Sequence, residues 1–269
     1  MTPKSYETAN ILVVIPVRNE ARSITAVVKQ LRALGFSLIR VVDNGSTDDS
    51  ATYAAAAGAE VLYEPRPGYG QACWRGLQQL PPDVEWILFC DGDGSDDLSS
   101  LPQWGQQRQA YDLMLSDRTA TEAGRRVLTP AQRWGNALAT SLIWLGWGHR
   151  YRDLGPLRLI RRQALEAIAM QDRGFGWTVE MQVRALELGL RVAEFPARYY
   201  PRRSGKSKIS GTLWGSLQAG WIILTTLGKL YVWKRAARGE GFIRGEDPKS
   251  LYPSSNHSSG ARESPGNPK

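Results

Sequence analysis

Apolar residues in the first third of the chain occur in short runs. The runs at residues 11–15, 38–42 and 86–90 are mostly apolar and too short for helices, so they predict buried strands. Residues 60–63 predict a further strand. Between the first two runs, residues 19–34 form an amphipathic pattern whose apolar face consists of Ile24, Val27, Val28 and Leu31. Residues 48–57 are rich in alanine and predict a second helix. This alternation predicts an α/β fold with a doubly wound, mostly parallel sheet.

Acidic residues follow several of the predicted strands. Glu20 comes soon after the first strand, Asp43 follows the second, and Asp91 and Asp93 follow residues 86–90. Because ligands bind at the carboxyl ends of the strands in an open α/β sheet, we expect these side chains to converge at one edge. Carboxylate oxygens suit a hard cation such as Mg²⁺ or Mn²⁺, which favours a phosphate-containing substrate. The alternative is an acidic turn, since Asp and Gly are common turn residues.

Several short motifs carry a resemblance to a known family. Residues 14–20 (VIPVRNE), 42–48 (VDNGSTD) and 91–93 (DGD) resemble family 2 glycosyltransferases with the GT-A fold. Residues 115–118 (LSDR), 153–158 (DLGPLR) and 203–208 (RSGKSK) are similar to the branch that contains dolichol-phosphate mannose synthase and other polyprenyl-phosphate glycosyltransferases. The resemblance covers residues 10–210. It implies a metal-dependent, inverting transfer of a sugar from a UDP- or GDP-linked donor, with a polyprenyl phosphate as the acceptor.

The resemblance also assigns roles on the donor side. The loop that contains Pro16, Asn19 and Glu20, together with Asp43, would bind the nucleoside. Asp91 would lie near the ribose and the metal, and Asp93 would bind the Mg²⁺ or Mn²⁺ on the donor diphosphate and so take part in catalysis. Related synthases often carry a glutamine as a further ligand two residues later, where this chain has Ser95, Asp96 and Asp97. Gly70 lies in a loop that would cover the nucleotide, or that simply forms a turn before the helix predicted at residues 71–80.

On the acceptor side the resemblance assigns a carboxylate and a set of cations. Asp153 matches the aspartate beside the acceptor, which is the general base in enzymes that glycosylate hydroxyl groups. A lipid phosphate is already anionic, so positive charge would matter more than a base. The candidates to hold it are Arg118, Arg133, Arg202, Arg203, Lys206 and Lys208. The alternative for residues 202–208 is a solvated surface loop. Asn44 and Leu157 depart from the family pattern, in which Asp and Phe are common.

The net charge and the distribution of tryptophans bear on the partners of the protein. The net charge of +8 is compatible with nucleic acid, phosphorylated ligands and anionic membranes. Six of the ten tryptophans fall within residues 132–147 and 213–233. The second stretch fits an interfacial amphipathic helix; the alternatives are a helix packed on protein or a membrane span. We therefore expect a glycosyltransferase domain at 10–210, an amphipathic, membrane-interfacial helix at 211–237 and a disordered tail at 238–269.

The remaining expectations concern location and rival functions. Two cysteines without a C-x-x-C motif favour a reducing compartment, so we expect a cytoplasmic protein bound peripherally to the inner face of the cell membrane. Within the family, the alternatives are transfer to a soluble hydroxyl acceptor with Asp153 as base, or a retaining reaction like that of glucosyl-3-phosphoglycerate synthases. Outside it, nucleotidyl transfer and a non-enzymatic, basic nucleic-acid-binding role are the rival hypotheses, although no nucleic-acid-binding motif is present.

Overall fold

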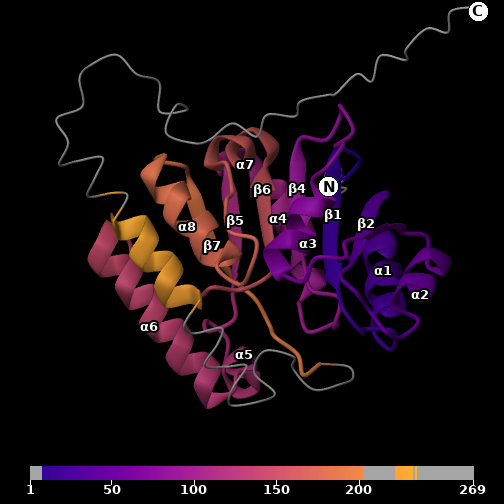
Figure 1. The fold of residues 1–269 in the computed structure, drawn as a ribbon, viewed down its shortest axis with the longest axis horizontal. Helices are drawn as coiled ribbons and strands as arrows, with labels where there is room; N and C mark the ends of the chain where they lie inside the picture. The colour runs from indigo at the N-terminus through magenta and orange to yellow at the C-terminus, as the bar shows by residue number, and fades with distance from the viewer. Residues whose placement is uncertain (1–7, 203–221, 233, 235–269) are drawn as a thin grey trace, which may run out of the picture. The chain divides into compact units, whose positions relative to one another are not determined.

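A single β-sheet forms the centre of the fold. In the computed structural model, which describes residues 8–202, 222–232 and 234, seven strands form one sheet in the order β3-β2-β1-β4-β6-β5-β7. These are β1 (Ile11–Val17), β2 (Leu38–Asp43), β3 (Glu60–Tyr63), β4 (Trp86–Phe89), β5 (Leu113–Asp117), β6 (Arg158–Arg161) and β7 (Val192–Pro196). All neighbours pair in parallel except β6, which is antiparallel to both β4 and β5. The predicted α/β sheet is confirmed (Figure 1).

Helices cover both faces of this sheet. Helices α1 (Ile24–Ala33), α2 (Ser50–Ala56) and α4 (Leu101–Gln107) pack on one face, where Val13, Val28, Ala54 and Trp104 share a core cluster. Helices α3 (Tyr69–Gly76), α6 (Pro130–Trp147), α7 (Arg162–Ile168) and α8 (Trp177–Glu187) pack on the other. The short helix α5 (Glu122–Val127) precedes α6. The predicted apolar face of α1 is buried as expected.

Three details differ from the sequence expectation. Pro16 lies inside β1 instead of ending it, which is possible because proline fits an extended backbone. The helix predicted at residues 71–80 begins at Tyr69 and ends at Gly76, where an added Cβ would clash with Val14 on β1. The antiparallel strand β6 was not foreseen. It matters for function because it brings the residues before it to the edge where β4 and β5 end.

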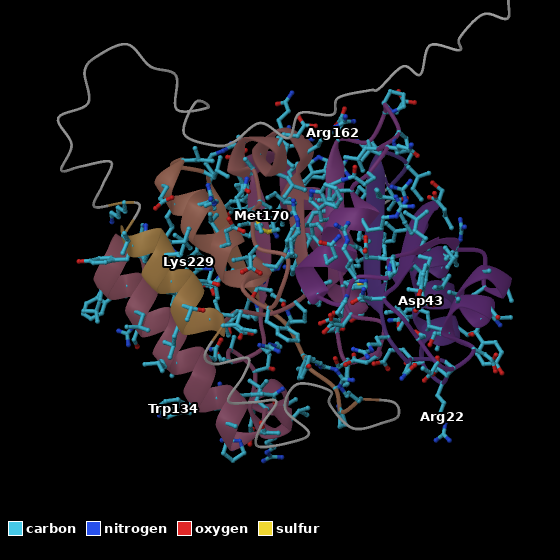
Figure 2. The ribbon with its side chains drawn as sticks, viewed as in Figure 1. Arg22, Asp43, Trp134, Arg162, Met170 and Lys229 are labelled. Carbon is cyan, nitrogen blue, oxygen red and sulfur yellow. The ribbon has the colours of Figure 1, made fainter. Side chains whose placement is uncertain are left out.

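Residues 222–232 form a helix that belongs to the same compact unit as the sheet. Its Leu227 and Leu230 are buried in the core cluster that contains α8 residues, and Tyr231 contacts Trp147 of α6 edge-to-face at 6.3 Å. In Figure 1 it lies along α6, and Figure 2 labels Lys229 on it. Among the described residues, no helix combines the length and the apolar character that crossing a membrane requires.

Candidate active site

The loops after β1 and β2 are tied together by side chains. Asn19 adopts a left-handed backbone (φ 55°), and its Oδ1 accepts the Thr47 N–H at 2.6 Å. In return, the Asn19 N–H donates to Ser46 Oγ, and the Glu20 N–H donates to Ser50 Oγ at 2.7 Å. These bonds hold the two loops as one rigid edge, with Glu20 buried within it.

Asp43 is the last residue of β2 and Asn44 follows it, and the two side chains make different hydrogen bonds. Asp43 is buried, and its Oδ1 accepts the Ser46 N–H at 2.9 Å. Asn44 Nδ2 donates to the carbonyl oxygens of Glu64 and Arg66, while its Oδ1 accepts the Gly68 N–H at 2.9 Å. An aspartate could not make the two donor contacts. Asn44, which replaces the aspartate common in the family, therefore anchors the loop at 64–68 to the end of β2.

The acidic loop after β4 is also organised internally. Asp93 Oδ1 accepts hydrogen bonds from the N–H and the hydroxyl of Ser95, at 2.9 and 2.6 Å. The Asp91 N–H donates to Asp96 Oδ2 at 2.9 Å. Burial and the neighbouring charge of Asp93 raise the pKa of Asp91 to about 7. The loop thus concentrates negative charge that a cation would relieve.

Arg202 joins the two acidic loops. Its guanidinium lies 2.9 Å from Asp93 Oδ2 and 3.2 Å from Glu20 Oε1. Three residues singled out from the sequence, 182 positions apart at the extremes, therefore meet at one point. Arg203, Lys206 and Lys208, which were predicted alongside Arg202, lie outside the described residues.

The carboxylate oxygens at this edge of the sheet are suitable ligands for a hard divalent cation. Asp93 Oδ2 is buried and accepts no hydrogen bond of good geometry, even though Arg202 is within ion-pair distance. In the described part of the chain, no three His, Cys, Asp or Glu side chains cluster as a complete metal site. Asp91 and Asp93 would therefore hold Mg²⁺ or Mn²⁺ together with water and substrate phosphate oxygens, as Mg²⁺ sites on phosphates commonly do. Such an ion neutralises the charge that develops on a departing diphosphate.

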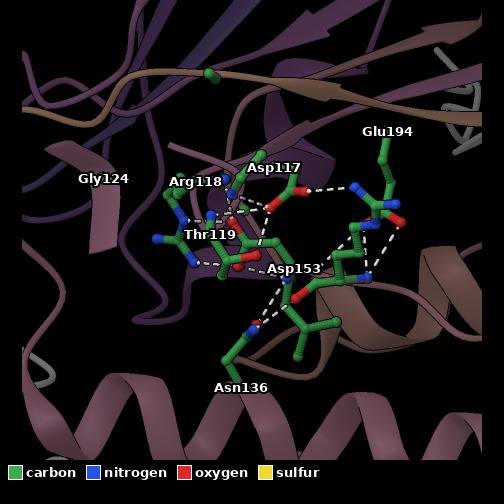
Figure 3. Close-up of polar contacts among 12 residues, drawn as sticks. Asp117, Arg118, Thr119, Gly124, Asn136, Asp153 and Glu194 are labelled. Carbon is green, nitrogen blue, oxygen red and sulfur yellow. Dashed lines mark hydrogen bonds and ion pairs between the residues drawn. The ribbon is translucent and has the colours of Figure 1, made fainter. Parts of the chain in front are cut away.

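Asp153 lies at the same edge of the sheet, just before β6, and is fully buried. Arg118, which follows β5, binds it through both guanidinium and backbone: Nε to Oδ2 at 2.7 Å, NH2 to Oδ1 at 2.9 Å, and N–H to Oδ2 at 2.9 Å (Figure 3). Arg118 also lies 5.0 Å from the centre of the Tyr199 ring. The sequence placed Asp153 and Arg118 in the site separately; the structure makes them one bidentate pair.

Three residues that the sequence reasoning missed position Asp153. Glu194 on β7 accepts the backbone N–H of Asp153 at 3.0 Å, and burial raises the pKa of Glu194. Asn136 on α6 accepts the Leu154 N–H and donates to the Arg152 carbonyl, both at 2.9 Å. Asp117 accepts the N–H and hydroxyl of Thr119 and so shapes the turn that carries Arg118 (Figure 3). Only Asp117 had a signal in the sequence, because it stands within the LSDR motif.

A groove of about 980 Å³ lies along α6, and Arg152, the residue before Asp153, is part of its lining. Four arginines line it: Arg125, Arg133, Arg150 and Arg152. Its apolar wall comes from α6 and its neighbours, with Leu128, Ala137, Trp144, Leu145 and Tyr151. Asn136 and Arg152 also line it and are hydrogen-bonded to each other. A groove of this kind suits a ligand that is anionic at one end and apolar along its length.

Gly70 packs against the loop before α8, a contact that the sequence did not predict. It is buried at the start of α3, and its N–H donates to the Gly174 carbonyl at 3.0 Å. The next N–H, of Gln71, donates to the Arg173 carbonyl at 2.7 Å. Its role in covering a nucleotide stays a prediction. The other departure from the family pattern, Leu157, is fully buried in the core.

The comparisons with known proteins decide the family. Residues 12–168 match the family model described as glycosyl transferase family 2. The chain belongs to glycosyltransferase family 2. It is 38% identical over 216 residues to an uncharacterized glycosyltransferase of Mycobacterium tuberculosis, covering 78% of this chain and 94% of that one. It is 31% identical over 247 residues to an undecaprenyl-phosphate mannosyltransferase of Micrococcus luteus, covering 86% and 96%.

Solved structures agree on the fold of this family 2 enzyme. Mannosyl-3-phosphoglycerate synthase from Rubrobacter xylanophilus superposes with a TM-score of 0.67 at 17% identity, covering 91% of this chain and 80% of that one. Glucosyl-3-phosphoglycerate synthase from Mycobacterium tuberculosis, in complex with Mn²⁺, UDP-glucose and phosphoglyceric acid, gives 0.64 at 22% identity, covering 84% and 82%. The GT-A fold is thereby confirmed. Family membership also argues against nucleotidyl transfer and against a non-enzymatic role.

Proposed function

We propose that this enzyme transfers a sugar from a UDP- or GDP-linked donor to a polyprenyl phosphate, with Mg²⁺ or Mn²⁺ and with inversion. The observation that carries the proposal is the arginine-lined, apolar groove whose lining includes Arg152 and Thr119, the chain neighbours of Asp153 and Arg118. The charge of Arg118 in turn acts on Asp91 in the acidic loop, which suits a metal-bound diphosphate. The relative from Micrococcus luteus, named as acting on undecaprenyl phosphate, supports the same acceptor class.

The state of Asp153 favours a phosphate acceptor over a hydroxyl acceptor. A general base must be free to take a proton, whereas both carboxylate oxygens of Asp153 are engaged by Arg118. A phosphate oxygen is already anionic and needs no base. In this proposal Asp153 fixes Arg118, and Arg118 with Arg133 attracts the phosphate. The enzyme would then work at the inner face of the cell membrane, where the lipid acceptor resides.

The first experiment is a donor and acceptor screen on the full chain. UDP- and GDP-sugars are offered with Mn²⁺ or Mg²⁺, with and without a short-chain polyprenyl phosphate, and product is measured by radiolabel transfer. We expect metal-dependent transfer to the lipid that EDTA abolishes. Asp93→Asn should lower kcat by about 100-fold or more, because it removes a group that stabilises charge in the transition state. Asp112→Asn, at the opposite end of β5, is the matched control and should retain activity.

The groove is tested by a matched pair of arginines. Arg133 lines the groove, whereas the exposed Arg126 does not and pairs with Glu122 instead. Arg133→Gln should raise the KM for the lipid phosphate about tenfold and leave donor hydrolysis unchanged, while Arg126→Gln should change neither. Transfer to a soluble hydroxyl compound, with none to the lipid, would reject the acceptor and restore Asp153 as a candidate base. Absence of nucleotide-sugar binding would reject the donor.

A further inference from the structure

The loop between α7 and α8 fills the space that two glycines leave open. At Gly68 an added Cβ would clash with the Arg173 carbonyl, and at Gly70 it would lie 2.8 Å from the Asp172 carbonyl oxygen. The same loop accepts the first N–H groups of α3, from Gly70 and Gln71. Those groups have no partner within their own helix. The Arg173 guanidinium also lies 4.6 Å from the centre of the Trp74 ring. Residues 172–174 therefore clamp the beginning of α3.

This loop is itself fixed from two sides. Glu180 of α8 is buried and accepts the N–H groups of Gln171 and Asp172, the latter at 2.7 Å, while it pairs with Arg184. From the other side, the Thr226 hydroxyl donates to Asp172 Oδ2 at 3.2 Å. Asp172 Oδ1 meanwhile accepts the Gly174 N–H at 2.7 Å. One carboxylate thus connects helix 222–232 to the loop that holds α3.

The space for this contact is built into the chain. At Gly176 an added Cβ would clash with both Asp172 Oδ2 and Thr226 Oγ1. Thr226 is buried between the helix and the loop, next to the buried Leu227. Its neighbour Thr225 donates only to the Ile222 carbonyl of its own helix, at 3.0 Å. The two threonines are therefore adjacent in the chain, but only Thr226 is hydrogen-bonded to the loop between α7 and α8.

We infer that helix 222–232 positions the donor-binding loop of the enzyme through the hydrogen bond from Thr226 to Asp172. The path continues from residues 172–174 to Gly68 and Gly70, and from Gly68 to Asn44 beside Asp43. Each step is a hydrogen bond or a close packing contact between described residues. Thr226 and Asp172 are positioning residues in this scheme and touch no substrate. The inference rests on the proposed function, whose sugar donor the loop that contains Gly70 would cover.

Hydrogen exchange tests the brace without any activity measurement. The variants of the full chain are Thr226→Val, which removes the hydroxyl at nearly constant volume, and Thr226→Ser, which restores it; Thr225→Val is the matched control. We expect Thr226→Val to speed exchange at least tenfold in peptides that cover residues 67–76 and 170–176, with Thr226→Ser and Thr225→Val unchanged. Unchanged exchange at 67–76 in Thr226→Val would overturn the inference. If that variant does not fold, Thr226→Ala removes the same hydroxyl without touching the bond between Asp172 and Gly174, and is judged by the same peptides.

Kinetics and binding then separate the two proposals. The donor KM of Thr226→Val should rise about fivefold to tenfold while kcat and the lipid KM stay within twofold, and Thr226→Ser should restore the donor KM. A fivefold to tenfold fall in kcat with an unchanged donor KM would overturn the positioning role of Thr226. If the unmodified enzyme binds neither UDP nor GDP with Mn²⁺ by calorimetry, the donor proposal fails. The exchange data still decide whether the brace exists.

Discussion

At the scale of single residues, the buried pair of Asp153 and Arg118 is the decisive feature. Two side chains that the sequence placed in the site separately are bound to one another, with the carboxylate completely inside the protein. Removing water from two charges is costly unless their contact is close and well oriented. This pair meets that condition, because it is bidentate and adds a bond from the Arg118 N–H.

Removing one partner of this pair should therefore destabilise the folded protein. Arg118→Met would leave the Asp153 carboxylate buried without its counter-ion and should lower the free energy of unfolding by about 3–5 kcal/mol. Combining it with Asp153→Asn should recover part of the loss, because a neutral amide oxygen still accepts the neighbouring N–H groups. Urea denaturation monitored by tryptophan fluorescence measures both.

The matched control for this experiment is Arg126→Met. Arg126 is exposed and pairs with Glu122, which is exposed too, so the change in stability should stay within about 0.5 kcal/mol. An Arg118 variant as stable as this control would mean that the pair does not hold the loop before β6.

At the scale of elements, glycines set how closely α3 approaches its neighbours. Gly68 has a φ of 146°, which side-chain-bearing residues rarely adopt, and faces the Arg173 carbonyl. Gly135, by contrast, lies within α6 with open space around the position of a Cβ. The same substitution should therefore have opposite effects at the two sites.

We expect Gly68→Ala to destabilise the protein by about 1–3 kcal/mol, through backbone strain and the clash with residue 173. Gly135→Ala should stabilise it by about 0.5–1 kcal/mol, because alanine is the better helix former. Thermal unfolding of the two variants provides the measurement. A Gly68→Ala variant as stable as the unmodified protein would show that the packing of α3 does not depend on Gly68.

At the scale of the whole molecule, exposed apolar side chains gather on α6. Trp134, Trp144 and Leu145 are 71%, 51% and 73% exposed, and Figure 2 shows Trp134 standing away from the helix. Arginines of the groove flank this face, among them Arg125, Arg133 and Arg150. Aromatic and aliphatic side chains beside cations are typical of surfaces that rest on anionic lipid.

Vesicle binding tests this face of the enzyme. The full chain should cosediment with vesicles that contain phosphatidylglycerol more strongly than with phosphatidylcholine alone, and less at high salt because the charges are screened. Trp144→Ser combined with Leu145→Ser should reduce binding about tenfold. Leu188→Ser is the control, since Leu188 is exposed but does not line the groove. Equal binding by the control and the double variant would place the membrane contact elsewhere.

Much of the donor side could be predicted from local pattern. Short apolar runs ending in acidic loops follow directly from the way parallel strands present their carboxyl ends. This is why the positions of Glu20, Asp43 and the loop at 91–93 were accessible from the residues alone. The roles of Asp91, Asp93 and Asp153 as ligands or bases remain predictions.

The tertiary structure decided what pairs with what. Asp153 is bound by Arg118 and positioned by Glu194 and Asn136, residues that come from four separate segments and meet only because β6 runs antiparallel. The bond from Thr226 to Asp172 spans 54 positions in the chain. The hydrophobic pattern of the sequence determined the strands and helices of the first third of the chain and the edge that carries their carboxylates, because burial and backbone periodicity are local. Pairings between distant segments depend on strand order and packing, which no local pattern encodes.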